Sequence, residues 1–378
     1  MPPLPEHDMF CRAAVKKFLN SPTGTLGLAG VLLLLLPAVY APFIANGRPF
    51  LLVTPQGVSF PFLEFLFAPD SSEFFIYQLF NFAAFFLPFF LFLRKKKLLL
   101  LITALLLLIP FIFTPRRMDK TDYRKLAKSP GVRAVFAPIP YGPVEIVAPP
   151  CEKPSRQHFL GTDTVGRDVA SRLIYGTRVS LAVGILATLI ALLIGTSVGL
   201  AAGYFRGWFD LCVMRLVEIL LCFPTFLLLL ILMSLLGDYK FEQSIPVVIL
   251  VIGLTGWIGL AFLVRGEVLK QCALPYIASC EVAGIPPLRI MFKHLLPNIT
   301  GPILISFTFG VAGAILAESS LSFLGFGVQP PTPSWGGLLR QAFDDPLDYW
   351  HLTFFPGLAL FIAVLSFNFS SYFFQKTR

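Results

Sequence analysis

The sequence predicts an all-α, polytopic membrane protein with about eight transmembrane helices. Of its 378 residues, 56% are hydrophobic and only 13% are charged, whereas a soluble domain carries roughly 25% charged residues. Mean hydropathy is +0.77. The apolar residues form continuous runs of Leu, Phe and Ile, without the alternation that is typical of a transmembrane β-barrel. This composition excludes a soluble globular protein and a disordered chain.

Eight stretches lack Asp, Glu, Lys and Arg over a length that suffices for a membrane-spanning helix of about 20 residues. They lie within residues 18–47, 74–93, 98–115, 179–205, 219–237, 243–264, 298–317 and 349–375. Basic residues precede the first run, as in a signal sequence. Because this run is long and no A-x-A site follows it, we interpret it as an uncleaved anchor.

Lys and Arg in the short loops predict the orientation, because cytoplasmic loops are enriched in them. Loops 206–218 and 265–297 and the C-terminal tail hold eight such residues, against Lys240 and Arg340 in the two alternate loops. Both termini are therefore expected in the cytoplasm. The formal charge of +9 follows from this distribution, so no nucleic-acid partner is expected. The basic segment 116–178 then lies outside the cell, because long loops translocate largely regardless of charge. If residues 74–115 did not span as two helices, this segment would lie inside instead.

These observations divide the chain into four parts. Residues 1–23 form a cytoplasmic N-terminal segment, and residues 24–45 form the first transmembrane helix. Residues 46–177 are extracytoplasmic, and a hydrophobic hairpin at about 74–115 is inserted in them. Residues 178–378 form a core of five helices. Seven prolines after the hairpin predict extended or turning backbone there, because proline breaks helices.

No motif for catalysis or for a resident metal is present in the sequence. It contains no G-x-x-x-x-G-K-[ST], no H-E-x-x-H and no G-x-S-x-G, the motifs of a P-loop, a zinc protease and a hydrolase. Its four His are scattered, and its six Cys show no CxxC spacing. We therefore expect a protein that is not an enzyme and holds no cofactor of its own.

Small residues recur every four positions in the predicted helix 179–205. They are Ala187, Ala191, Gly195, Gly199 and Gly203. A ridge of small side chains lets two helix backbones approach closely in lipid. Gly195, Gly199 and Gly203 are therefore predicted to pack against another helix.

A carboxylate interrupts the apolar run 298–324. Glu318 is followed by Ser319 and Ser320, and an ionisable side chain within a membrane costs about 2.5–3.5 kcal/mol on insertion scales. These three residues could line a polar translocation path. Alternatively, Glu318 lies near the outer end of its helix, hydrogen-bonded by serines and water.

The most informative stretch is the predicted cytoplasmic loop 265–297. Pro275 can start a short helix, and Gly284 with two following prolines ends it. A second amphipathic turn follows and stops at Pro297. Two short, stiff helices of this kind would transmit a partner's push to the flanking spans. An ordinary amphipathic surface loop is the alternative.

This loop resembles the E-A-A loop of permease subunits in ABC importers, in which a glycine and a later Leu-Pro follow the E-A-A. Gly284 and Leu296-Pro297 match at the right separation. Residues 158–169, 171–180 and 321–336 resemble peptide-importer permeases of the oligopeptide and dipeptide C type, so the similarity covers about residues 156–378. Shorter stretches at 44–51 and 154–157 resemble the microcin-C-type oligopeptide permease branch.

The resemblance implies a type I ABC importer permease core in a bacterial plasma (inner) membrane, with the hairpin as an insertion. It implies import of oligopeptides or dipeptides. It further implies as partners a second permease subunit, two ATP-binding subunits that hold ATP and Mg, an extracytoplasmic peptide-binding protein and membrane lipid. A secondary transporter driven by protons, with Glu318 as coupling carboxylate, is the alternative.

One departure from the family pattern concerns the missing glutamate. The family's E-A-A falls on Ala278-Ser279-Cys280. Glu281 lies three residues further on, hence on nearly the same helix face, and our hypothesis is that it supplies the displaced carboxylate. The predicted ATPase-coupling residues are Ala278, Glu281, Gly284, Arg289, Leu296 and Pro297.

Overall fold

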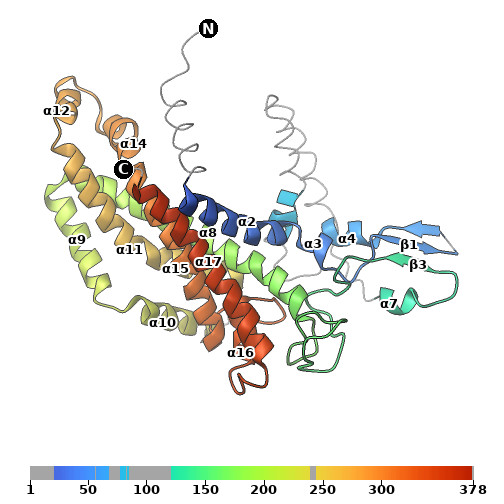
Figure 1. Ribbon diagram of the computed structural model, residues 1–378. Coiled ribbons are helices and arrows are strands. Elements are labelled where there is room, and N and C mark those ends of the chain that lie inside the picture. The colour runs from blue at the N-terminus through green and yellow to red at the C-terminus, as the bar shows by residue number, and fades with distance from the viewer. Residues whose placement is uncertain are drawn as a thin grey trace, which may run out of the picture. The chain divides into compact units, whose positions relative to one another are not determined.

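The computed structural model is mainly helical (Figure 1). It describes residues 21–55, 57–67, 77–81, 83–84, 121–238 and 244–376. The N-terminal residues 1–20 and most of the predicted hairpin 74–115 lie outside the described residues. The chain forms two compact units. The first unit comprises Met1–Leu32, Val183–Leu321 and Leu360–Arg378, and the second comprises Leu33–Ala182 and Ser322–Ala359.

Five helices of the described residues are long and apolar enough to cross a membrane. They are α2 (Pro22–Val39), α8 (Val169–Phe205), α11 (Ile245–Cys272), α15 (Thr300–Leu324) and α17 (Trp350–Lys376). Two further helices, α9 (Gly207–Leu221) and α10 (Thr225–Asp238), meet the same criteria only as a pair. The predicted class of a helical, polytopic membrane protein is confirmed.

The predicted continuous span 219–237 is wrong. α9 ends at Leu221, α10 begins at Thr225, and the two helices meet at an angle of 83°. Pro224 lies in the break, where it lacks a backbone N–H and disfavours helical backbone at the residue before it. α10 has 14 residues, and at about 1.5 Å per residue it is shorter than the roughly 30 Å hydrocarbon core.

The second unit contains a small antiparallel sheet with strand order β2-β1-β3. The strands are β1 (Leu51–Thr54), β2 (Gly57–Ser59) and β3 (Arg133–Val135), and the short helices are α3 (Ala41–Ile44), α4 (Pro61–Phe67), α7 (Tyr123–Leu126) and α16 (Trp335–Gln341). The rings of Phe43, Phe50 and Phe62 pack edge to face or stacked. This segment therefore has a small core of its own.

α8 begins ten residues before the charge-free run that starts at residue 179. The carboxylate of Asp168 caps it by accepting the N–H of Ser171 at 2.8 Å. Its first turns include Arg172 and Arg178, which are both buried. Buried charges are tolerated only when they are paired or hydrogen-bonded, and the second unit supplies these contacts.

Asp163 is fully buried at the turn before α8. It accepts the backbone N–H groups of Val165 and Arg167, each at 2.9 Å, and the Nε–H of Arg167 at 2.8 Å. The Nε of Arg172 lies 3.3 Å from the same carboxylate. A single carboxylate thus fixes the turn and neutralises charge on two buried arginines.

Arg178 caps the C-terminal end of α2 within the same unit. Its guanidinium donates to the carbonyls of Ala38 at 2.6 Å and Val39 at 3.0 Å. These carbonyls belong to the last turn of α2, where no intrahelical donor remains and a positive charge is favoured. The same guanidinium lies 5.3 Å from the centre of the Tyr175 ring. These contacts offset the cost of burying the charge.

In the first unit, α8 packs closely against α11. A Cβ added at Gly195 would lie 2.9 Å from the Trp257 carbonyl oxygen, and one at Gly199 would lie 2.6 Å from that of Ala261. At Gly203 it would lie 3.0 Å from the Arg265 carbonyl oxygen. Distances under 3.0 Å are not found for real Cβ atoms, so the small ridge of α8 lies against the α11 backbone.

Candidate translocation groove and coupling elbow

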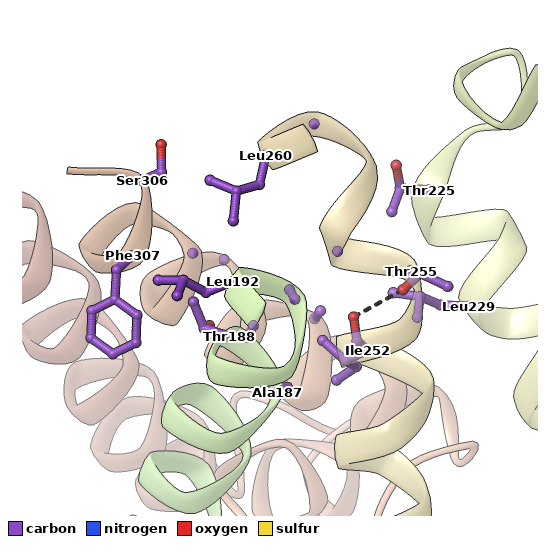
Figure 2. Close-up of a pocket in the computed structure, with 17 residues that line it drawn as sticks. Ala187, Thr188, Leu192, Thr225, Leu229, Ile252, Thr255, Leu260, Ser306 and Phe307 are labelled. Carbon is purple, nitrogen blue, oxygen red and sulfur yellow. Dashed lines mark hydrogen bonds between the residues drawn. The ribbon is translucent and has the colours of Figure 1, made fainter. Parts of the chain in front are cut away.

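A groove of about 370 Å³ lies among α8, α10, α11 and α15 in the first unit (Figure 2). We call it the groove, and it is lined by Ala187, Thr188, Ala191, Leu192, Thr225, Leu229, Ile252, Thr255, Gly256, Gly259, Leu260, Ser306, Phe307, Gly310, Gly313, Ala314 and Ala317. Glycine, alanine and hydroxyl residues make up most of this lining, and the others are large and apolar. None of these side chains carries a charge.

Two hydroxyl groups of the groove, those of Thr188 and Thr255, already donate their protons within their own helices. Thr188 donates its proton to the carbonyl of Gly184 at 2.7 Å. Thr255 donates to the carbonyls of its own helix one turn back, including Ile252 at 3.1 Å (Figure 2). Because each hydroxyl has one proton and two lone pairs, both residues present acceptors to the groove. The groove can therefore accept hydrogen bonds but cannot hold a ligand by charge.

The predicted path residues do not line the groove. On α15 its lining runs from Ser306 to Ala317 and stops one residue before Glu318. Glu318 and Ser319 are buried, whereas Ser320 is exposed. The hydroxyl of Ser319 donates to Glu318 Oε2 at 3.3 Å. This contact agrees with the interpretation of a serine-bonded carboxylate, and a role in transport stays a prediction.

Residues 273–299, which we call the elbow, join α11 to α15. Their first helix, α12 (Pro275–Val282), begins at Pro275 as predicted. It ends in a Schellman motif, in which the Gly284 N–H donates to Glu281 O at 3.0 Å and the Ile285 N–H to Cys280 O at 3.1 Å. Gly284 has φ +70°, a conformation that glycine adopts without strain.

The second part of the elbow is one continuous helical stretch of changing pitch. It consists of α13 (Pro287–Arg289), the π-helix η1 (Ile290–Leu295) and α14 (Leu296–Asn298). The predicted stop at Pro297 is wrong, because Pro297 is the second residue of α14. Because the stretch is continuous, Pro297 lies in its last turn, where its missing N–H removes a single backbone hydrogen bond.

The inner face of the elbow is packed on the ends of two long helices. Ile277, Ile290 and Leu295 are buried with Val264 and Val268 of α11, and Leu200 of α8 joins this cluster. Burying each such side chain contributes about 1.5–3 kcal/mol. The attachment favours a stiff connection over a loosely held surface loop. In Figure 1, α12 and α14 lie together at one end of α11.

The outer face of the elbow is exposed and partly apolar. Val282 is 90% exposed, Leu288 64% and Phe292 57%. Five of the six predicted coupling residues are exposed on the elbow, and Leu296 is half-buried. The carboxylate of Glu281 interacts with the Tyr204 hydroxyl near the end of α8. Exposed apolar side chains beside basic ones are typical of a protein–protein contact surface.

An ion pair that sequence reasoning missed lies close to the elbow. Arg265 of α11 binds both carboxylate oxygens of Asp210 in the first turn of α9, with Nε–Oδ1 at 2.5 Å and Nη2–Oδ2 at 2.6 Å. Bidentate pairs of this kind are strong and directional. The pair ties α9 to the cluster that supports the elbow. The two residues are 55 positions apart, so no local spacing reveals it.

The chain was compared with known proteins. The model of the family described as "Binding-protein-dependent transport system inner membrane component" matches residues 195–377. The glutathione transport system permease protein GsiD of Pectobacterium atrosepticum is 40% identical over 217 residues, which is 57% of this chain and 70% of that relative. The chain belongs to this family. GsiD of Escherichia coli O6:K15:H31 is also 40% identical, over 215 residues and 69% of its length.

The chain is therefore a membrane permease subunit of an ABC importer, and the predicted family is confirmed. The matched region of the permease contains the whole elbow and the α10, α11 and α15 sides of the groove. Sequence reasoning missed the groove glycines, although a signal was present. Gly256 and Gly259 on α11, like Gly310 and Gly313 on α15, are three residues apart and hence share a helix face.

Proposed function

We propose that the permease forms one half of a translocation path for small peptides, and that its elbow receives the force of ATP-binding subunits. The observation that carries this proposal is the uncharged groove of about 370 Å³ between spanning helices. Its size falls within the range of roughly 300–1,000 Å³ that is typical of small-molecule pockets. The two relatives named above are glutathione permeases by name, and glutathione is a tripeptide.

The chemistry of the groove suits a peptide that is held loosely. A peptide backbone carries N–H donors, and Thr188 and Thr255 offer acceptors whose own protons are already used. Without a charged side chain in the lining, the groove makes no strong contact with either charged terminus of a peptide. A substrate held in this way is released readily, as import requires.

The elbow is positioned to change the groove. It joins the end of α11 to the beginning of α15, and both helices form walls of the groove. Its buried face is packed on α11 and α8, so a push on its exposed face would shift these helices together. Glu281, through its interaction with Tyr204, is proposed to supply the carboxylate that is displaced from the family's E-A-A.

The complex that we propose contains a second permease, two ATP-binding subunits that hold ATP and Mg, and an extracytoplasmic peptide-binding protein. In this assembly the permease itself catalyses no reaction, and both of its termini lie in the cytoplasm of a bacterial cell. The proton-coupled alternative depends on Glu318, which does not line the groove. Family membership favours the ATP-driven importer.

Reconstitution tests the proposal. The permease with its partner subunits is placed in lipid vesicles, and uptake of a radiolabelled tripeptide is measured with ATP, without ATP and with a proton gradient alone. ATP-dependent uptake is the expected result. Uptake by the permease alone, without any nucleotide hydrolysis, would contradict it. A Glu281→Ala complex that still assembles and transports at the wild-type rate would remove the proposed role of that carboxylate.

A further inference from the structure

We propose that Gly259 of α11 and Gly313 of α15 set the width of the groove and thereby allow peptides with bulky side chains to pass. This inference rests on the proposed function. Both residues line the groove, and both are exposed. Their lack of a side chain leaves open space in its wall.

The glycines of the groove fall into two kinds. A Cβ added at Gly310 would lie 2.7 Å from Thr188 Cγ2, and one at Gly256 would lie 3.3 Å from Ala191 Cβ. At these two positions glycine is explained by close contact with α8. Among the described residues, a Cβ added at Gly259 or Gly313 would meet nothing within 4 Å. Packing therefore does not account for glycine at these two positions.

Backbone conformation does not account for them either. Neither Gly259 nor Gly313 has a positive φ, and both lie inside long helices, where glycine is among the least favourable residues. Any residue with a side chain other than proline would be a better helix former. At these two positions, unlike at Gly266 and Gly301, the open space left by glycine faces the groove, where a substrate can occupy it.

The substrate class follows from this geometry. The groove holds about 370 Å³, and a leucine side chain on either helix would fill a substantial share of it. A peptide with bulky side chains needs the full width and is excluded first. A peptide of alanine or glycine needs less and continues to pass. Charge of the peptide should matter less than its width, because the lining is uncharged.

Four matched variants test this inference in the full-length permease, assembled with its partners in vesicles. Gly259→Leu and Gly313→Leu narrow the groove. Gly266→Leu on α11 and Gly301→Leu on α15 are the controls, because a Cβ there also meets nothing within 4 Å and neither residue lines the groove. Uptake of trialanine and of triphenylalanine is measured beside ATP hydrolysis.

Both groove variants are expected to lose triphenylalanine uptake at least tenfold and trialanine uptake less than twofold, with the controls unchanged. Ala and Val at the same two positions should give intermediate ratios, which separates narrowing from misfolding. Equal loss of both peptides, or equal behaviour of groove variants and controls, would overturn the inference while the proposed function stands. Failure of the wild-type complex to take up either peptide with ATP would overturn both.

Discussion

The second unit and the groove of the first unit use polar groups in opposite ways. At the start of α8, the second unit buries several charges that hold one another in place, among them Asp163, Arg167 and Arg172. The groove is lined by 17 residues without a charge. In it, the hydroxyl protons of Thr188 and Thr255 are donated to carbonyls of their own helices.

The difference separates two physical tasks. A buried carboxylate that accepts several N–H groups permits a single geometry, because any displacement leaves a charge unpaired at high cost. A wall of small and apolar side chains binds nothing strongly and lets a substrate move. The elbow combines both properties, since one of its faces is packed and the other is exposed. Five experiments test this comparison, in order of decreasing effect.

Replacing the central carboxylate of the second unit should have the largest effect. Asp163→Ala leaves Arg167 and Arg172 buried without their counter-charge and removes the oxygen, Oδ1, that accepts two backbone N–H groups. Removing one partner of a buried ion pair costs about 3–5 kcal/mol. We expect a large drop in the melting temperature of the detergent-purified permease. Asp344→Ala, at an exposed carboxylate of the same unit, should change little, and equal drops would contradict the assigned role.

Breaking the Asp210–Arg265 pair should have the next largest effect. A hydrogen bond to a charged group contributes about 1.5–3 kcal/mol, and this pair is bidentate. Asp210→Arg and Arg265→Asp are each expected to lower peptide uptake per ATP hydrolysed, because α9 no longer moves with α11. The double exchange restores the opposite charges and should recover part of the loss. If the double variant is as impaired as the two single variants combined, the pair does not connect these helices.

Altering the glycine turn of the elbow should have a smaller effect on peptide uptake. Gly284→Ala forces an alanine into φ +70°, which costs roughly 1–2 kcal/mol, although a Cβ there meets no atom within 4 Å. The strain should loosen the end of α12, so that ATP hydrolysis continues while peptide uptake falls severalfold. Gly266→Ala, which needs no positive φ, is the matched control. Unchanged coupling in Gly284→Ala would show that the turn need not be rigid.

A pH experiment examines Glu145, a half-buried carboxylate of the second unit whose charge is compensated incompletely. Burial raises the pKa of Glu145 above 4.5, although Arg124, at 3.1 Å, acts in the opposite direction. The folded protein then keeps this proton at a pH where the unfolded chain has lost it. The contribution of Glu145 to stability is therefore present below pH 4.5 and falls as the pH rises through the raised pKa.

The variant Glu145→Gln removes this titration. The melting temperature of this variant, relative to that of the wild type, should rise as the pH is raised from about 4 to about 7. At the higher pH only the wild type holds an ionised, half-buried carboxylate at this position. The comparison is made on the purified permease in a detergent that does not titrate in this range. A difference between the two proteins that is constant with pH would show that Glu145 is compensated fully.

The smallest effect is expected at a hydroxyl of the groove. Thr188→Ala removes a group whose proton is already donated to Gly184, so only one acceptor is lost. Peptide uptake should change less than twofold. Thr188→Asp, in contrast, places a charge in the groove and should reduce uptake strongly, because it would bind the peptide's amino terminus too tightly. Equal uptake by both variants would show that the groove does not contact the substrate.

Much of the fold could be predicted from local features of the chain. The lengths of the apolar runs gave five of the spans within the described residues. Pro275 and Gly284 marked the ends of α12 correctly. The break at Pro224 was missed because apolar residues continue on both sides of it, and the start of α8 was missed because Arg172 and Arg178 are charged. In the first case the continuous apolar run outweighed the proline in the prediction. In the second case the two charges outweighed the helical pattern around them.

The sites were harder to predict, because their partners are distant in sequence. Arg265 finds Asp210 across 55 positions, and the groove combines residues of four helices. The carboxylate of Glu318 attracted attention because charge within a span is costly, yet the groove lining stops at Ala317. Charge alone therefore does not locate a groove that is built from uncharged residues, and a role of Glu318 in transport stays a prediction.

The amino-acid sequence by itself determined that this chain is a helical membrane protein, which apolar runs contain most of its spans, and that it carries an elbow of the importer-permease kind. These properties follow from composition, from apolar run length and from proline and glycine positions, which act within a few residues. Only the tertiary structure decided which glycines separate helices and which leave space, and which carboxylate meets which arginine. Such choices depend on how closely distant segments approach, and that distance is not encoded in any local spacing.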